Sequence, residues 1–293
     1  MQRKMMLIVN PFSGRGISKS ALGTIVSSLC SSDYVVSVYF AGEYTAEQLA
    51  YNFSKEHDLV VCVGGDGTLS NVVSGLMRSN SAVAVGYIPT GTANDIANSL
   101  ALSKVPSEAA QNIINGTERY LDVGDFGGRY FTYIAAFGAF TGVSYQTPQS
   151  AKRALGQFAY ILGGVGVMTT IKPRRTIVEH DFGIIEGDYV FGAVVNSTSV
   201  AGLVKLAPEH VDLADGMFEI ILVRQPLNLA DFSAIITNLS TKSYDGDNVI
   251  MLHSSKVKFT LDCEVAWTVD GEYGGDHKEI EIKNCREAIK IIV

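Results

Sequence analysis

The segment that most restricts what this chain can fold into is Val63-Gly-Gly-Asp-Gly-Thr68. It follows an apolar, strand-like run, Leu59–Val63, and opens a helical stretch, Leu69–Met77. Glycines let a backbone approach a phosphate closely, and the first N–H groups of a helix have no internal partner and point at the anion. A carboxylate in such a loop repels phosphate unless a cation or a proton transfer is involved. Asp66 therefore indicates a nucleotide with Mg²⁺, and so phosphoryl transfer.

Two further segments have the same form. Asn10-Pro-Phe-Ser-Gly14 follows the apolar run Leu7–Val9, and Pro89-Thr-Gly-Thr-Ala-Asn-Asp95 follows Ala82–Ile88. Each places small hydroxyl residues and glycine between a strand and a helix. Ligands of open α/β sheets bind at the carboxyl ends of the strands. We therefore expect the three loops to meet at one sheet edge and form one nucleotide crevice.

The first part of the chain alternates strand and helix patterns, which predicts a parallel sheet with covering helices. One helix is expected to begin at Thr45 with a capping box to Gln48, and another to run from Pro106 to Asn115. The strands are continuous apolar runs, as strands covered on both faces require. They are Met5–Val9, Tyr34–Phe40, Leu59–Val63 and Ala82–Ile88.

Strand patterns dominate after about Leu121, which predicts a β-rich, antiparallel second domain. Two helical stretches, Ala151–Thr170 and Leu227–Leu239, interrupt them. With 293 residues the chain is long enough for two domains, and we expect them to span residues 1–122 and 123–283. The expected strands are Arg129–Phe137, Arg175–Phe182, Tyr189–Val195, Phe218–Val223, Lys256–Leu261 and Val265–Val269.

The three loops together resemble the signatures of the diacylglycerol kinase catalytic family, which includes soluble bacterial lipid kinases and the sphingosine kinases. Asp212-Leu-Ala-Asp-Gly-Met217 and Asp270-Gly-Glu272 also match, so the resemblance covers nearly the whole chain. It implies an ATP-dependent lipid kinase with Mg²⁺. It also implies a first domain with the fold shared by NAD kinases and diacylglycerol kinases, to which residues 284–293 return.

The resemblance implies a set of site residues. Glu272 is the expected proton acceptor, with Asp270 beside it and Asp66 near the phosphates. We expect the glycines around this acidic pair to leave both residues exposed in a flexible loop, although Asp-Gly is also a strong turn signal. Asp95 has a second interpretation as a helix cap. The expected nucleotide-binding residues are Asn10, Pro11, Ser13, Gly14, Thr45, Gly64, Gly65, Asp66, Gly67, Thr68, Ser70, Thr90 and Asp95.

The resemblance also implies a metal loop at Asp212, Asp215 and Met217, for which a plain Asp-Gly hairpin turn is the alternative. Asp122 and Asp125 are weaker candidates for an acidic network with Asp66 and Asp95. This chain departs from the family at Ser70-Asn71, where members commonly have Asn-Glu.

The distribution of charge along the chain bears on whether the protein contacts a membrane. The chain has a net charge of −7, yet it has no Asp or Glu from Phe126 to Val178. Cations that bracket an apolar stretch favour an anionic membrane, and a buried helix with solvated ends is the alternative. The cations are Arg129, Lys152, Arg153, Lys172, Arg174 and Arg175.

We expect a cytoplasmic protein with peripheral membrane contact, a lipid as partner and no nucleic acid; a homodimer stays open. The acceptor also stays open among diacylglycerol, a sphingoid base, phosphatidylglycerol and a polyprenol. Two rival functions remain. One is an NAD kinase, which shares the glycine loop, and the other is a nucleotide-binding regulator without catalysis.

Overall fold

The computed structural model describes residues 2–14, 16–138, 172–200, 204–205, 212–241 and 244–293. The helix predicted over Ala151–Thr170, with Lys152 and Arg153, lies outside the described residues.

The first part of the chain forms the parallel sheet that the sequence predicts. Its strand order is β4-β3-β1-β2, with every neighbouring pair parallel. The strands are β1 (Arg3–Val9), β2 (Tyr34–Phe40), β3 (Leu59–Gly64) and β4 (Ala84–Pro89), and the helices are α1 (Lys19–Cys30), α2 (Ala46–Phe53), α3 (Asp66–Ser79), α4 (Asp95–Ser99) and α5 (Pro106–Asn115), with a short 3₁₀ turn at Ser54–Glu56.

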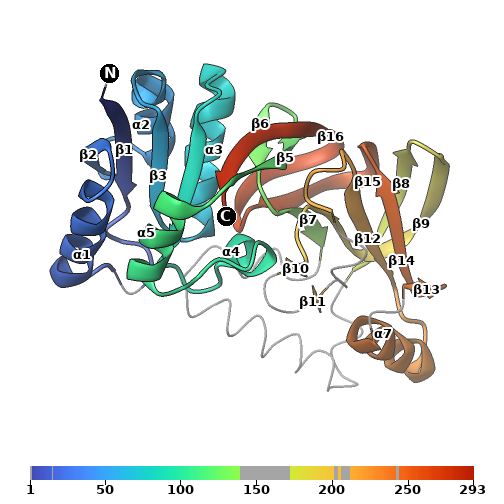
Figure 1. The fold of residues 1–293 in the computed structure, drawn as a ribbon. Coiled ribbons are helices and arrows are strands. Elements are labelled where there is room, and N and C mark those ends of the chain that lie inside the picture. The colour runs from blue at the N-terminus through green and yellow to red at the C-terminus, as the bar shows by residue number, and fades with distance from the viewer. Residues whose placement is uncertain (1, 15, 139–171, 201–203, 206–211, 242–243) are drawn as a thin grey trace.

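Helices cover both faces of this sheet (Figure 1). Met6 and Ile8 of β1 pack in one cluster with residues of α2 and α3. Met5 and Leu7 face the other way, into a cluster with residues of α1 and α5. Strands β3 and β4 are buried along their whole length, as continuous apolar strands covered on both faces should be, whereas the edge strand β2 exposes Val35, Val38 and Phe40.

The predicted helix ends are confirmed at α2 and α5. Thr45 caps α2: its hydroxyl accepts from the Gln48 N–H at 3.2 Å, and its own N–H donates to Gln48 Oε1 at 2.9 Å. Pro106 begins α5, which ends at Asn115.

The rest of the described chain is largely antiparallel. Phe137, Phe259 and Trp267 meet in its core through edge-to-face and tilted ring contacts. The elements are β5 (Glu118–Phe126), β6 (Arg129–Phe131), β7 (Ile134–Gly138), β8 (Arg174–His180), β9 (Gly183–Val195), β10 (Ser199–Val200), β11 (Val204–Lys205), β12 (Phe218–Arg224), α7 (Leu229–Thr241), β13 (Asp245–Gly246), β14 (Val249–Ser254), β15 (Lys256–Val269) and β16 (Glu272–Ile292).

Two predictions about these strands are wrong in detail. The strand expected over Arg129–Phe137 is broken into β6 and β7, because the N–H groups of Thr132 and Tyr133 bond a carboxylate, Asp270, instead of a neighbouring strand. The two strands expected over residues 256–269 form one strand, β15, with an irregularity in register between Thr260 and Val265.

Strand β16 links the two parts (Figure 1). It leaves a hairpin with β15, runs antiparallel to β5, and ends parallel to β4, where Ile291 pairs with Val85. The last residues therefore lie against the first sheet. Among the described residues, no helix combines the length and apolar character needed to cross a bilayer.

Candidate active site

The three predicted loops lie side by side at the carboxyl ends of β1, β3 and β4. Asn10 Nδ2 donates to Thr68 Oγ1 at 3.0 Å, which joins the turn after β1 to the first turn of α3. The Thr90 N–H donates to the Gly64 carbonyl at 2.7 Å, which joins the turn after β4 to the end of β3. Pro11 and Ser13 lie in the first of these turns. The loops therefore form one continuous backbone surface.

Glycine permits this close contact. A Cβ atom on Gly91 would lie 2.5 Å from the Cα of Gly65, and one on Gly65 would lie 3.1 Å from Ser13 Oγ. Gly14 has a φ of +61°, and a Cβ there would lie 2.4 Å from the Thr90 carbonyl oxygen. Within the described part of the chain, the buried Thr90 hydroxyl has no hydrogen-bond partner.

Two carboxylates stand at the helix N-termini of this surface. Asp66 begins α3 and is 8% exposed, and Asp95 begins α4 and is 2% exposed. Burial, followed by repulsion from Asp95, raises the pKa of Asp66 to about 6, although the Ile96 N–H donates to Asp66 Oδ1 at 3.3 Å and opposes the rise. A cation would relieve this crowding, because Mg²⁺ is typically held by one or two carboxylates together with substrate phosphates.

Asp270 is buried, which corrects the prediction that it is exposed in a flexible loop. Asp270 and Gly271 form the tight turn between β15 and β16, with φ of +48° and +82°. Asp-Gly is the pair that such a hairpin turn favours, because both central residues need positive φ. The turn interpretation of this motif is therefore confirmed. Asp270 also lines the cavity described below, so the same residue belongs to both the turn and the candidate site.

The Asp270 carboxylate holds the β6–β7 connection. Oδ2 accepts from the N–H and the hydroxyl of Thr132 at 2.7 and 3.0 Å, and Oδ1 accepts from the N–H groups of Tyr133 and Ile134 at 3.1 and 3.0 Å. The Ser70 hydroxyl on α3 lies near this carboxylate and lowers its pKa. Burial raises the pKa of Asp270, and these hydrogen bonds oppose the rise.

Glu272 follows the turn and is exposed, as predicted. Arg129 Nη2 lies 3.1 Å from Glu272 Oε2, and the exposed fractions of the two side chains are 39% and 59%. Arg129 Nη1 also donates to the Tyr273 carbonyl. The guanidinium and the carboxylate therefore stand together at the start of β16 with access to solvent.

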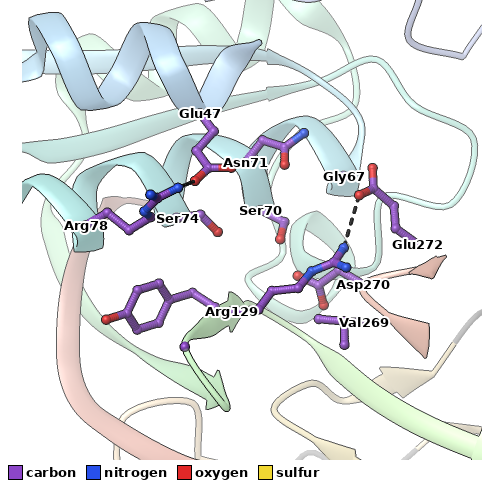
Figure 2. Close-up of a pocket in the computed structure, with 12 residues that line it drawn as sticks. Glu47, Gly67, Ser70, Asn71, Ser74, Arg78, Arg129, Val269, Asp270 and Glu272 are labelled. Carbon is purple, nitrogen blue, oxygen red and sulfur yellow. Dashed lines mark hydrogen bonds and ion pairs between the residues drawn. The ribbon is translucent and has the colours of Figure 1, made fainter. Parts of the chain in front are cut away.

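A cavity of about 340 Å³ joins these groups (Figure 2). Gly67, Ser70, Asp270 and Glu272 line one end of it together with Arg129. A Cβ on Gly67 would lie 3.9 Å from Glu272 Oε1, so the glycine turn and the hairpin face each other across a short gap. Further lining residues are Glu47, Asn71, Ser74, Arg78, Gly128, Tyr130 and Val269.

Thr45 lies apart from this group. It is exposed, its hydroxyl caps α2, and it is outside the described cavity lining, whereas Glu47 two residues later is part of the lining.

The predicted metal loop is closed by its own turn bonds. Asp212 Oδ1 accepts from the Ala214 N–H at 3.1 Å, and Asp215 Oδ1 accepts from the Met217 N–H at 2.8 Å. Asn284 donates to the Met217 carbonyl at 3.2 Å. Over the residues described, no group of three or more His, Cys, Asp or Glu side chains is placed to hold a metal. Metal binding at this loop stays a prediction.

Asp122 and Asp125 have other partners than the network suggested for them. Asp122 is buried and accepts from the N–H groups of Gly216 and Glu287 at 2.7 and 2.6 Å, so it anchors the 212–217 loop to β16. Asp125 accepts from the Gly128 N–H at 2.6 Å in the β5–β6 turn.

Sequence reasoning missed Arg129, Glu47 and Gly91 as members of the site. Gly91 lies inside a recognised loop. In the sequence, Arg129 belongs to the cationic region, and Glu47 lies between the two capping-box residues Thr45 and Gln48. Neither of these two residues lies in a glycine turn, so each becomes visible only through the packing of one element on another.

This chain is similar to known proteins in both sequence and fold. The diacylglycerol kinase catalytic domain family matches residues 4–126. The diacylglycerol kinase of Bacillus subtilis is 34% identical over 280 residues, which cover 93% of this chain and 91% of that protein. A Staphylococcus epidermidis diacylglycerol kinase is 33% identical over 279 residues, covering 94% and 87%. The crystal structure of a diacylglycerol kinase from Bacillus anthracis has the same fold, with a TM-score of 0.81 at 20% identity over 99% of this chain and 96% of that one.

The resemblance found in the sequence motifs is thus confirmed over almost the full length. The chain belongs to the diacylglycerol kinase family, whose members are phosphotransferases with an alcohol acceptor.

Proposed function

We propose that this protein transfers the γ-phosphoryl group of ATP to the free hydroxyl of diacylglycerol, presented at a membrane surface. One observation carries the proposal: the glycine turn at Gly67 and the exposed Glu272 face each other across one cavity, with Arg129 beside them. Phosphoryl transfer needs a donor phosphate and an acceptor hydroxyl held in line, and little covalent chemistry from the protein.

The donor end is formed by the glycine loops. Backbone N–H groups at the start of α3 would bind the phosphates, since the first N–H groups of a helix favour an anion. Asp66 and Asp95 offer oxygen ligands for Mg²⁺, and the raised pKa of Asp66 fits a site that a cation completes. Bound there, Mg²⁺ would offset the negative charge of the triphosphate.

The acceptor end is formed by the hairpin and β6. Glu272 is the carboxylate with solvent access, so it takes the proton of the lipid hydroxyl. Asp270 accepts hydrogen bonds from Thr132, Tyr133 and Ile134, and it positions the hairpin rather than receiving a proton. Arg129 stabilises the negative charge of the phosphoryl group as it moves.

Transfer of label from [γ-³²P]ATP to lipids in mixed micelles tests this function. The lipid panel holds diacylglycerol, a sphingoid base, phosphatidylglycerol and a polyprenol, with and without Mg²⁺. Label on diacylglycerol that depends on Mg²⁺ supports the proposal. Label on another lipid replaces the acceptor and keeps the mechanism, whereas the absence of label on every lipid overturns the proposal.

A further inference from the structure

One face of α3 is polar along the whole cavity. Gly67, Ser70, Asn71, Ser74 and Arg78 line the cavity, with the spacings 3, 1, 3 and 4 that place residues on one helix face. At 1.5 Å per residue, the levels of Gly67 and Ser74 are about 10 Å apart. The cavity thus extends well beyond the glycine turn and has a far end that phosphoryl transfer does not use.

Glu47 enters this far end from the neighbouring helix (Figure 2). Its Oε1 lies 2.6 Å from Arg78 Nη1, and Figure 2 shows its carboxylate between Arg78 and Asn71. Helices α2 and α3 touch here, because a Cβ on Gly75 would lie 2.4 Å from the Glu47 carbonyl oxygen. The position of Glu47 over α3 is therefore fixed by backbone contact as well as by its ion pair.

The ion pair between Glu47 and Arg78 contributes little to the stability of the fold. The exposed fraction is 61% for the Arg78 side chain and 29% for that of Glu47, and ion pairs with this much access to water contribute little to folding. Arg78 engages one carboxylate oxygen, while a carboxylate can accept about four hydrogen bonds. Glu47 thus keeps the capacity to accept from donors in the cavity.

The glycine loop of this chain ends in Ser70-Asn71, without the acidic residue common in the family. Among the described lining residues, α2 instead supplies a carboxylate, that of Glu47, which Figure 2 shows beside Asn71. A nucleoside triphosphate with its phosphates at the Gly67 end would extend its sugar along α3 toward Glu47. Sugar hydroxyls are the donors that a fixed carboxylate recognises.

We propose that Glu47, positioned by Arg78, binds the ribose hydroxyls of the donor nucleotide and so selects ribonucleotides over deoxyribonucleotides. The inference rests on the proposed ATP-dependent function and deepens it. Asn71 and Ser74 complete the polar surface around the sugar.

Isothermal titration calorimetry without lipid tests the inference, because no turnover occurs. The probes are ATP, 2′-deoxyATP, 3′-deoxyATP and inorganic tripolyphosphate, each with Mg²⁺. The proteins are wild type, Glu47→Gln, Glu47→Asp and the control Glu56→Gln, which removes an equal charge at an exposed position outside the cavity. Thermal unfolding of each variant checks that it is folded.

We expect the wild type and Glu56→Gln to bind ATP about tenfold more tightly than at least one deoxy analogue. Glu47→Gln should bind ATP and both analogues with equal, weaker affinity, and Glu47→Asp should fall between. Tripolyphosphate affinity should be the same in all four proteins.

Three results would overturn the role of Glu47: wild type that does not discriminate, a Glu47→Gln protein that discriminates as well as wild type, or an equal loss of tripolyphosphate binding. If the wild type binds ATP and phosphorylates lipid but shows one of these results, the Glu47 inference fails alone. If the wild type binds no nucleotide, the donor assignment fails and this inference fails with it.

Discussion

Asp270 accepts two hydrogen bonds from one residue, Thr132, through its backbone N–H at 2.7 Å and its hydroxyl at 3.0 Å. This pairing ties the β15–β16 turn to the point at which β6 ends and β7 has not yet begun. The carboxylate thus replaces the strand ladder that the sequence between Arg129 and Phe137 would otherwise form.

Asp270→Asn should destabilise the protein by about 3 kcal/mol, since an amide nitrogen would then face N–H donors and leave them unpaired. Asn tolerates the positive φ at this position, so backbone strain does not add to the effect. Urea unfolding at pH 7 measures the loss. Asp276→Asn, an exposed residue of the same strand, is the control, and an equal stability of the two variants would refute the positioning role.

Glu272→Gln should lower the rate of lipid phosphorylation at least about 100-fold, because the proton acceptor is lost while the residue is exposed and the fold does not depend on it. The rate in mixed micelles and the midpoint of thermal unfolding are the two measurements. Glu279→Gln, on the same strand, should keep wild-type activity. A Glu272→Gln protein with wild-type turnover would remove this residue from the mechanism.

Asp66→Asn should be more stable than wild type in a pH-dependent manner. The folded-state pKa is about 6 and the ordinary value is 3.8, so below pH 4 both states are protonated and the two proteins differ little. As pH rises from 4 to 6 the unfolded wild type ionises first, and its stability falls relative to the variant by up to about 3 kcal/mol. Urea unfolding with a chelator at pH 4, 5 and 7 gives the profile. The exposed Asp33→Asn should show no such trend.

Glu219→Gln tests the same pH-dependent stability effect at a buried carboxyl outside the candidate active site. Glu219 lies on β12, is 2% exposed, and has its pKa raised by burial from 4.5 to about 8. His253 Nε2, at 3.9 Å from Glu219 Oε1, is too far to form a hydrogen bond.

The stability of the wild type relative to Glu219→Gln should therefore decline as pH rises from 4.5 to 8 and level off above pH 8, once the buried carboxyl is ionised in the folded state as well. Unfolding curves across this range test the prediction, with the exposed Glu264→Gln as control. Lipid phosphorylation at pH 7 should match the wild type. A flat difference with pH would show that Glu219 is not buried in its neutral form.

Gly75→Ala should separate α2 from α3. A Cβ at this position would lie 2.4 Å from the Glu47 carbonyl oxygen and 2.8 Å from the Ala50 Cβ, and overpacking of this kind costs about 1–3 kcal/mol. Gly23→Ala, in α1 with nothing within 4 Å of the added atom, should instead stabilise by about 0.5–1 kcal/mol. Thermal unfolding compares them, and two shifts of the same sign would contradict the packing described.

The sequence predicts the features that depend on residues close together in the chain. The apolar strands and the glycine turns after β1, β3 and β4 were predictable because backbone approach and strand burial each leave a short pattern. Asp270 was predicted to be exposed because glycines surround it, whereas its burial depends on donors at Thr132 and Tyr133, more than 130 positions earlier in the chain. No local pattern encodes such a pairing.

The same limit explains the residues that were missed. Arg129 faces Glu272 from a different strand, and Glu47 faces Asn71 from a different helix. Strand β16 was anticipated only at its ends, as an acidic turn and an apolar tail, because its middle section is charged and lacks a continuous apolar run.

Strand β16 carries a consequence for how this enzyme can be divided. Ile289 and Ile291 belong to the same buried cluster as Met6 and Val60, and Ile291 pairs with β4. A fragment that stops at residue 126 would expose β4 as an unprotected edge, and exposed edges recruit strands from other molecules. Such a fragment should aggregate, so the stretch that the catalytic-domain model matches is not by itself a unit of folding.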